Sequence, residues 1–591
     1  MTVALAPPRD LLDRPVSLRE EPVQPPKRSW DEGRLEGAVS FGLPFTVYLV
    51  AAVLLAFKYH SFPEDAVSRM ANGFYVLYSG DPHLASIGFV WNPLQSVADA
   101  VVLTFNHIWP ALASHDMAGS LVSVAAMAGA VYQLDASLRE WRCPVPARVV
   151  LTLTFALNPM ILYYGANGMS EGLYLFTLMA STRYLLRWTR QGDLHSLVYS
   201  ASALGLCYLA RNEAVGAAFL AVPVVFAVSY VRELRGSEDD DHSTGRRERI
   251  GTAVADAFIF GLPTIVAAVG WATTSFVITG QPFAQFTSIY GNSSQESFLA
   301  HKNLHARLTY EIHALGGLAP TLIVVVVVAL VVGYRRRNVA SLVPLAVIGG
   351  ALLFDVGGYL TNTIENFLRY FITAIPLCVV LVGSLFDRST HRPAREPRTV
   401  RPFTKYWSTW TLGVAATLLS AVLLLPSVFT TAEAMANPAV GVQESSLLGP
   451  VFHRHLSAGD RAVDASYPDI QAISAYLSGL KLPNGSVVVD NFTSCVPDVI
   501  TNIEQPKLFV IPNDRDFQRV LADPLTFHAH YILEADPTSA PITAVNIAYP
   551  TLWASGAGFT KLFHQIAAKG DCPEFRLFRV FTHPSEVNTA R

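Results

Sequence analysis

Long apolar runs recur along this chain as far as Phe429 and are separated by short polar segments. A run of roughly 17 to 25 mostly apolar residues can cross the hydrocarbon core of a bilayer as a helix. About eleven segments meet that criterion: 41–57, 117–134, 147–163, 171–188, 194–210, 214–230, 255–279, 317–334, 341–357, 367–386 and 410–429. The pattern predicts a polytopic α-helical membrane protein.

The basic residues indicate how these spans are oriented. With the N-terminus inside, the inner loops carry most of the Arg and Lys, for example the run 335–337, whereas the outer loops hold chiefly Lys58, Arg69, Lys302 and Arg307. Such a bias is typical of membrane proteins. The partly apolar segment 96–114 would reverse every later loop if it crossed the membrane, so we predict an interfacial or re-entrant helix there.

The same pattern divides the chain into three parts. Residues 1–37 are polar and Pro-rich, with no apolar core of the signal-peptide kind, and are predicted to form a disordered cytoplasmic tail. Residues 38–429 form the transmembrane module, with a first outer loop over 58–116. An odd number of spans places residues 430–591 outside the cell membrane. There, strand-like runs at 487–490, 508–511, 531–533 and 575–581 alternate with amphipathic stretches at 469–480 and 514–521, which predicts an extracytoplasmic α/β domain.

Composition and charge agree with a membrane protein. Only 15% of the residues are charged, and the mean hydropathy is +0.33. The formal net charge of −3 gives no large basic face, so a nucleic-acid partner is not expected. Cys495 and Cys572 are the two cysteines in the predicted outer domain. Because an oxidising compartment favours disulfides, we predict that they pair.

Polar residues gather where four predicted outer loops meet the membrane. These are Glu64, Asp65, Arg69 and His83 in the first outer loop, Asn167 and Glu171 between the third and fourth spans, Arg211 and Glu213 between the fifth and sixth, and Glu365, Arg369 and Tyr370 at the tenth. Each cluster also has a structural interpretation, as a helix cap or as an ion pair that helps helices pack. Their occurrence on one side favours a functional interpretation.

Transfer of a sugar from a polyprenyl-phosphate carrier to a hydroxyl suits such a face. The lipid tail of the donor lies in the bilayer while its phosphate and sugar lie at the surface. Arg211 and Arg369 are the candidate phosphate ligands, because guanidinium groups match phosphate oxygens in a forked geometry. A carboxylate of the first outer loop can serve as the base for the acceptor hydroxyl. One base suffices for a single displacement with inversion.

The first outer loop with Glu64-Asp65 and the turns Gly165-Ala-Asn-Gly-Met-Ser-Glu171, Leu209-Ala-Arg-Asn-Glu213 and Glu365-Asn-Phe-Leu-Arg-Tyr370 resemble the membrane glycosyltransferases of the GT-C fold. The resemblance is to the polyprenyl-phosphate-sugar-dependent branch, with protein O-mannosyltransferases, the aminoarabinose transferase of lipid A and actinobacterial cell-wall mannosyl- and arabinosyltransferases. It implies that an acid of the first outer loop acts as base or binds a metal.

By that resemblance Asp65 is the expected base and Glu64 an auxiliary acid, with the register between the two acids left open. Arg211 and Arg369 hold the donor phosphate, and the other clustered residues support the cavity. No cofactor is certain; a divalent cation, Mg²⁺ or Mn²⁺, is a candidate with Asp65 and Glu64 as its ligands. The expected location is a bacterial, actinobacterial plasma membrane.

The expected activity is therefore an inverting transfer of mannose or arabinose from a polyprenyl-phosphate donor to a hydroxyl of a cell-envelope glycan, lipid or protein. The expected partners are that donor, a glycan or glycolipid acceptor and the lipid bilayer. Two alternatives belong to other classes. A transporter or flippase of lipid-linked sugars typically shows internal repeats and ionisable residues near mid-membrane, and neither is evident here. A non-catalytic envelope scaffold does not require the clustered acids and arginines.

Overall fold

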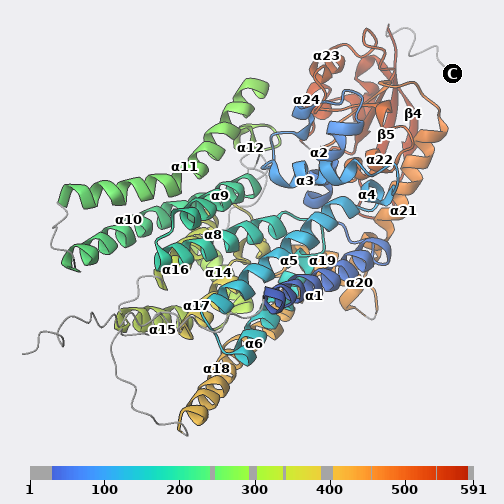
Figure 1. Cartoon of the computed structure of the whole chain (residues 1–591). Helices are drawn as coiled ribbons and strands as arrows, with labels where there is room; N and C mark the ends of the chain where they lie inside the picture. The colour runs from blue at the N-terminus through green and yellow to red at the C-terminus, as the bar shows by residue number, and fades with distance from the viewer. Residues whose placement is uncertain are drawn as a thin grey trace, which may run out of the picture.

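The computed structural model describes residues 30–239, 246–291, 303–336, 341–387, 404–453, 455–540 and 542–582. A bundle of long helices carries a unit with a small β-sheet at one end (Figure 1). Seven helices are long and apolar enough to cross a membrane, or up to eight if a bent pair counts as one span. The chain is thus a polytopic α-helical membrane protein with a C-terminal sheet unit. The predicted tail over residues 1–37 falls mostly outside the described residues.

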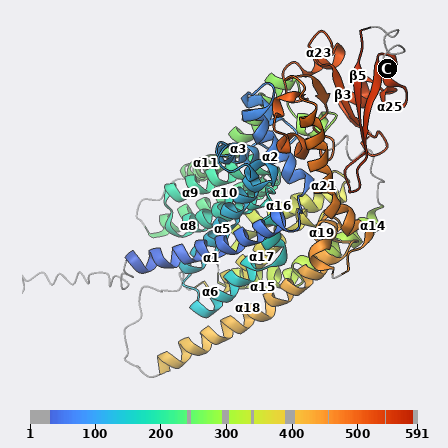
Figure 2. The ribbon, with the colours of Figure 1, turned by 90° about the vertical axis from the view of Figure 1, so that its right-hand side faces the viewer.

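The bundle contains helices that run in chain order. They are α1 (Trp30–Phe57), α5 (Met117–Glu140), α6 (Val145–Ala156), α7 (Pro159–Tyr164), α8 (Glu171–Gln191), α9 (Leu194–Ala210), α10 (Ala214–Asp239), α11 (Arg246–Thr279), α12 (Ala284–Thr287), α14 (Leu304–Leu318), α15 (Leu322–Arg335), α16 (Leu342–Leu360), η3 (Leu368–Phe371), α17 (Ala374–Leu385) and α18 (Thr404–Ala436). Figure 2 shows the same bundle from the side, with the C-terminal sheet above it.

Each of the eleven predicted spans lies on helical structure, but seven of them, or eight with the bent pair, lie on described helices of at least 18 residues that are apolar enough to cross a membrane. The predicted span 147–163 is broken into α6 and α7 at Asn158-Pro159, and the Asn158 side chain caps α7 by accepting a hydrogen bond from the Met160 N–H at 3.0 Å. Helix α8 carries charged residues toward both ends, and α9 has only 17 residues. The segment 317–334 belongs to the pair α14 and α15, which is bent by 73°.

Small residues let the helices approach closely. A Cβ added at Gly216 of α10 would lie 2.5 Å from the carbonyl oxygen of Gly350 on α16, and one at Gly350 would lie 2.6 Å from the Gly216 oxygen. In lipid, helix association depends on such close packing rather than on the hydrophobic effect between helices. The contact fixes α16 against α10, and α16 contributes to the cavity described below.

The first outer loop folds as a group of short helices. They are α2 (Glu64–Tyr78), η1 (Leu84–Ile87), α3 (Leu94–Leu103) and α4 (Ala111–Ser114). The predicted interfacial helix over 96–114 is therefore two helices with a turn between them. Met70 and Phe74 of α2 share one hydrophobic cluster with Ile473 and Val499 of the C-terminal unit. Burial of these side chains holds the loop and the unit together.

The C-terminal unit, residues 442–582, contains a five-stranded sheet with the order β2-β1-β3-β5-β4. Its strands are β1 (Val487–Val489), β2 (Phe509–Val510), β3 (Tyr531–Ala535), β4 (Thr560–Ile566) and β5 (Phe575–Val580), and its helices are α19 (Val442–Leu447), α20 (Gly449–Phe452), α21 (Ala458–Gly479), α22 (Val496–Asn502), η4 (Pro506–Leu508), α23 (Phe517–Ala522), α24 (Ala544–Ala548), α25 (Leu552–Ser555) and η5 (Gly556–Gly558). β1 is parallel to β2 and β3, whereas β5 is antiparallel to β3 and β4.

The four predicted strands are present, and β4 was not predicted. Most of its side chains are exposed, so the strand lacks the apolar alternation that indicates a half-buried strand. Cys495 and Cys572, the two cysteines predicted to pair, form a disulfide with an S–S distance of 2.12 Å and a Cα–Cα distance of 5.7 Å. It links the start of α22 to the segment before β5.

Candidate active site

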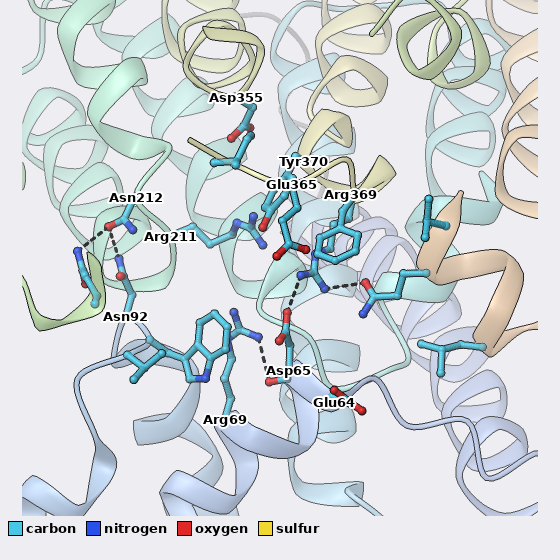
Figure 3. A pocket seen from close by; sticks show the side chains of 18 of the residues that line it. Glu64, Asp65, Arg69, Asn92, Arg211, Asn212, Asp355, Glu365, Arg369 and Tyr370 are labelled. Atoms are coloured by element: carbon cyan, nitrogen blue, oxygen red, sulfur yellow. Dashed lines mark hydrogen bonds and ion pairs between the residues drawn. The ribbon is translucent and has the colours of Figure 1, made fainter. Parts of the chain in front are cut away.

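A cavity of about 1480 Å³ lies between the helical bundle and the C-terminal unit. Its lining comes from the start of α2, the turn after α9, the end of α16, the segment before η3, and helices α19, α21 and α22. Figure 3 shows side chains from these distant segments pointing into one space. A cavity of this size is large enough for a sugar with its attached phosphate.

The two adjacent acids lie at the first turn of α2. Pro63 precedes the helix in an extended conformation, and Glu64 and Asp65 are the first helical residues. Negative charge is favourable there because the unsatisfied N–H groups of a helix start carry partial positive charge. Both predicted carboxylates line the cavity and are held in place by the first turn of α2.

Asp65 is joined to an arginine that is distant in the sequence. Its Oδ2 lies 2.5 Å from Nη2 of Arg369, which is on η3. Nη1 of Arg369 also donates to Oε1 of Gln443 at 2.8 Å, and only 4% of Arg369 is exposed. The ion pair thus joins the first outer loop to the start of the tenth predicted span, two of the segments whose polar residues were expected to lie together.

Arg211 is enclosed by two carboxylates. It ends α9 in an extended conformation, and its Nη1 and Nη2 lie 2.6 Å from Glu171 Oε1 and 2.5 Å from Glu213 Oε1. Glu171 also lies 3.9 Å from Nε of Arg369. The guanidinium carbons of Arg211 and Arg369 are each 5.5 Å from the centroid of the Tyr370 ring, which lies between them. Both carboxylates on Arg211 reduce its capacity to bind a further anion.

Arg69 has a different environment. Its Nη1 donates to the backbone oxygen of Asp65 at 2.9 Å, and its guanidinium carbon is 4.1 Å from the centroid of the Trp91 ring. Only 7% of Arg69 is exposed, yet it lines the cavity. Among the described residues, no carboxylate side chain forms an ion pair with Arg69, in contrast to Arg211 and Arg369.

The two adjacent acids differ in ionisation. Burial by itself would raise the pKa of Asp65, but the guanidiniums of Arg369 and Arg69 outweigh it and hold that pKa below its ordinary value. Glu64 instead has a raised pKa, mainly because of burial and then because of the neighbouring charges of Asp65 and Asp571. A hydrogen bond from Ser494 Oγ to Glu64 Oε1 at 2.6 Å opposes that rise. Asp65 therefore interacts mainly with Arg369 and Arg69, whereas Glu64 contacts the C-terminal unit through Ser494.

Two predicted residues lie away from the cavity. His83 Nδ1 contacts Ser86 Oγ at 2.8 Å within the first outer loop, next to Asp81, which is paired with Arg515 of the C-terminal unit. Asn167 is buried and its Oδ1 accepts a hydrogen bond from the Met169 N–H at 3.2 Å. Neither residue lines the cavity, since one stabilises a loop and the other a turn, and their supporting role stays a prediction. Glu171 is fully buried behind Arg211, whereas Glu365 and Tyr370 do line the cavity.

Other lining residues were not among the predicted site residues, although Asn92 and Asn212 lie in the predicted outer clusters. Asn212 Oδ1 accepts hydrogen bonds from Asn92 Nδ2 at 3.1 Å and from Gln285 Nε2 at 3.4 Å, which joins the first outer loop to α9 and α12. Ser494, Asp498 and Asp571 line the cavity from the C-terminal unit. Single polar residues in a soluble domain are common, so only the tertiary contact identifies them.

A divalent cation does not fit these residues. Within the described parts of the chain, no group of three or more His, Cys, Asp or Glu side chains is arranged to hold a metal ion. Asp65 is held by Arg369, and Arg69 lies beside it. A cation ligand set needs several oxygen donors, and three arginines nearby oppose it.

No protein-family model matches this chain, and no curated protein matches it. Two solved structures of the oligosaccharyltransferase of Archaeoglobus fulgidus are similar to it. One is a crystal structure tethered by a disulfide bond to an acceptor peptide containing the NVT sequon, with TM-score 0.42, 10% identity, and coverage of 93% of this chain and 74% of that one. The other, named AglB, is in complex with an inhibitory peptide and a dolichol-phosphate, with TM-score 0.40, 11% identity, and coverage of 90% and 73%. Likeness at this level assigns no residue and no substrate to this chain.

Proposed function

We propose that the protein is an inverting membrane glycosyltransferase that moves a sugar, mannose or arabinose, from a polyprenyl-phosphate donor to a hydroxyl of a cell-envelope acceptor. The resemblance of its outer turns to GT-C enzymes supports this proposal. The observation that carries it is the meeting, in one cavity, of Arg211 and Arg369 from two distant segments with Arg69 and the two acids of α2. By the predicted topology, this cavity faces the outer side of a bacterial plasma membrane, with the N-terminus in the cytoplasm.

The donor phosphate binds at Arg69 and Arg369 in this proposal. Arg369 was expected in this role, whereas Arg211 was the expected second ligand. The contacts favour Arg69 over Arg211, because Arg211 already has two carboxylate partners and Arg69 has none among the described residues. Trp91 supports the Arg69 guanidinium from one face and so fixes its direction. Arg211 then acts by keeping Glu171 and Glu213 in place.

The base for the acceptor hydroxyl was expected to be Asp65, with Glu64 second. The contacts favour the reverse. Asp65 is ion-paired with Arg369 at 2.5 Å, and its lowered pKa makes it a weaker proton acceptor. Glu64 has a raised pKa and no cation partner among the described residues, so it is the stronger proton acceptor of the two acids. Asp65 in this scheme orients Arg369 toward the phosphate.

The reaction then follows as one displacement. The Glu64 carboxylate takes the proton from the acceptor hydroxyl, and the hydroxyl oxygen forms a bond to the anomeric carbon of the donor sugar. The bond from that carbon to the phosphate oxygen breaks, and polyprenyl phosphate leaves as an anion. Arg69 and Arg369 stabilise the charge that develops on the leaving phosphate. Attack opposite the leaving group inverts the anomeric configuration.

The test is transfer by the purified protein in detergent. Decaprenyl-phosphate mannose and decaprenyl-phosphate arabinose are offered with a mixed cell-wall glycolipid acceptor, and wild type is compared with Arg69→Gln. We expect turnover of one donor, and a donor KM raised about tenfold or more in the variant, because a charged hydrogen bond to phosphate is lost. If neither donor is consumed, the proposal fails, and a flipping assay in vesicles tests the alternative of a lipid-linked sugar transporter.

A further inference from the structure

Arg369 is held from two sides, and one of them belongs to the C-terminal unit. Its Nη2 lies 2.5 Å from Asp65 Oδ2 of the first outer loop, and its Nη1 donates to Oε1 of Gln443 on α19 at 2.8 Å. Figure 3 shows the Arg369 side chain directed at Asp65, with both of its contacts drawn as dashed lines. Two parts of the chain that are far apart in sequence therefore meet on one guanidinium group.

The two contacts fix the guanidinium plane and leave N–H groups for a ligand. A guanidinium carries five N–H donors in a rigid planar fork, so acceptors on both terminal nitrogens set its direction. The rings of Phe367 and Tyr370 lie 4.7 and 5.5 Å from the guanidinium carbon of Arg369. Its Nε is buried without a hydrogen-bond partner among the described residues, because the Glu171 oxygen at 3.9 Å is too distant for such a bond.

The acceptors on Arg369 differ in charge from those on Arg211. Arg211 lies 2.6 and 2.5 Å from the carboxylates of Glu171 and Glu213. Within hydrogen-bond distance, Arg369 has one carboxylate and the neutral amide of Gln443. An amide oxygen accepts a hydrogen bond without adding a negative charge. Arg369 is thus oriented by two acceptors while it keeps more of its attraction for an anion than Arg211 does.

Helix α19, which carries Gln443, is itself attached to the bundle. The Tyr164 hydroxyl of α7 donates to Oε1 of the next residue, Glu444, at 2.6 Å, and both side chains are buried. Ser61 Oγ donates to the backbone oxygen of Leu447 at 2.9 Å. On its other side α19 packs against α21 of the C-terminal unit. The position of Gln443 therefore depends on how this unit is docked on the bundle.

We propose that Gln443 is a positioning residue for the donor site: as a neutral acceptor it holds the Arg369 guanidinium in the direction that binds the donor phosphate. Through α19, the docking of the C-terminal unit then sets the affinity for that phosphate. This inference rests on the proposed function, which takes Arg369 as a phosphate ligand. A site whose groups must first be ordered binds its ligand less tightly, because the cost of ordering is subtracted from the binding free energy.

Binding of two lipids to the full-length protein in detergent tests the inference. Decaprenyl phosphate and decaprenol differ only in the phosphate, so a change confined to the first reports the phosphate contact. Gln443→Met removes the acceptor and keeps a side chain of similar length. We expect the Kd of decaprenyl phosphate to rise about tenfold and that of decaprenol to stay unchanged. An unchanged Kd for decaprenyl phosphate, or an equal rise for both lipids, overturns the inference.

A second variant and a matched control complete the test. Gln443→Glu keeps an acceptor of the same length and adds a charge, and it serves if Gln443→Met does not fold. Because Arg369 then lies against two carboxylates, as Arg211 does, we expect a severalfold rise in the Kd of decaprenyl phosphate. An unchanged Kd contradicts the role of a neutral acceptor. Ser445→Ala should behave as wild type, since Ser445 is on the same helix, does not line the cavity and donates to the Val442 oxygen at 3.4 Å.

Tyr164→Phe tests the part played by α19. It removes the bond from α7 to Glu444 and leaves Gln443 in place. We expect the folded fraction to bind decaprenyl phosphate severalfold more weakly, with decaprenol binding unchanged. A wild-type Kd in this variant contradicts the link to docking of the C-terminal unit. Failure of decaprenyl phosphate to bind wild type defeats the proposed function, whereas equal binding by wild type and Gln443→Met defeats this inference alone.

Discussion

The bundle side of the cavity and the side made by the C-terminal unit differ in how their charged groups are paired. On the bundle side, Arg211 and Arg369 are buried and each has a carboxylate within 2.6 Å. On the side of the C-terminal unit, Asp498 and Asp571 have no ion pair with a described residue, and burial together with Glu64 raises the pKa of Asp498 to about 7. Arginines in a helical bundle need partners because an isolated buried charge is costly. Asp498 and Asp571 instead line the cavity without such a partner.

The largest effect is expected at the base. Glu64→Gln should lower kcat by about 10² to 10⁴-fold with little change in the donor KM, because proton transfer is lost while the arginines remain. Asp65→Asn should instead raise the donor KM, because Arg369 loses the partner that orients it. Steady-state kinetics with the donor that is turned over measures both. Full activity of Glu64→Gln together with complete loss in Asp65→Asn would return the role of base to Asp65.

The next effect concerns the central ion pair. Arg369→Ala should lower kcat/KM by about 10² to 10³-fold, since one donor to the leaving phosphate is removed. It should also lower the free energy of unfolding by about 3 to 5 kcal/mol, because Asp65 keeps a buried charge without its partner. Transfer assays and denaturation in detergent measure the two effects.

The control for that change is Arg190→Ala. Arg190 lies 3.2 Å from Asp387 in another buried pair outside the cavity lining. We expect its removal to destabilise the protein while the folded fraction keeps its activity. If Arg190→Ala lowers kcat/KM of the folded protein as much as Arg369→Ala does, the effect at Arg369 is one of stability only.

The smallest effect is a shift in pH dependence. Glu64 works as a base only when ionised, so activity is lost as pH falls through its pKa, which lies above the ordinary value. Asp65 and Asp571 raise that pKa, Asp498 also faces Glu64, and the hydrogen bond from Ser494 lowers it. Ser494→Ala removes the lowering contact and should move the acid limb of the profile of kcat/KM to higher pH.

Ser446→Ala is the matched control for Ser494→Ala. Ser446 lines the cavity and makes no described hydrogen bond to Glu64. We expect its acid limb to coincide with that of wild type. An acid limb that stays in place in Ser494→Ala argues against Glu64 as the titrating base.

The sequence predicted the bundle side of the site better than the other side. Asp65, Arg211, Arg369 and Glu365 were selected because the polar residues of four predicted outer loops gather on one side of the membrane. Asp498 and Asp571 were not found, because isolated acids in a soluble domain are common. His83 and Asn167 were assigned supporting roles on the same reasoning as Asp65, and in the structure their hydrogen bonds lie within a loop and a turn.

The apolar pattern by itself determined that this chain is a polytopic membrane protein with a C-terminal α/β unit, because burial in lipid requires long apolar helices whatever their arrangement. It did not determine the number of spans, since a charged helix such as α8 is covered largely by neighbouring helices rather than by lipid. Tertiary structure alone decided which arginine is paired with which carboxylate. Those pairs join residues as far apart in the sequence as Asp65 and Arg369, so the spacing of residues along the chain does not predict the contact.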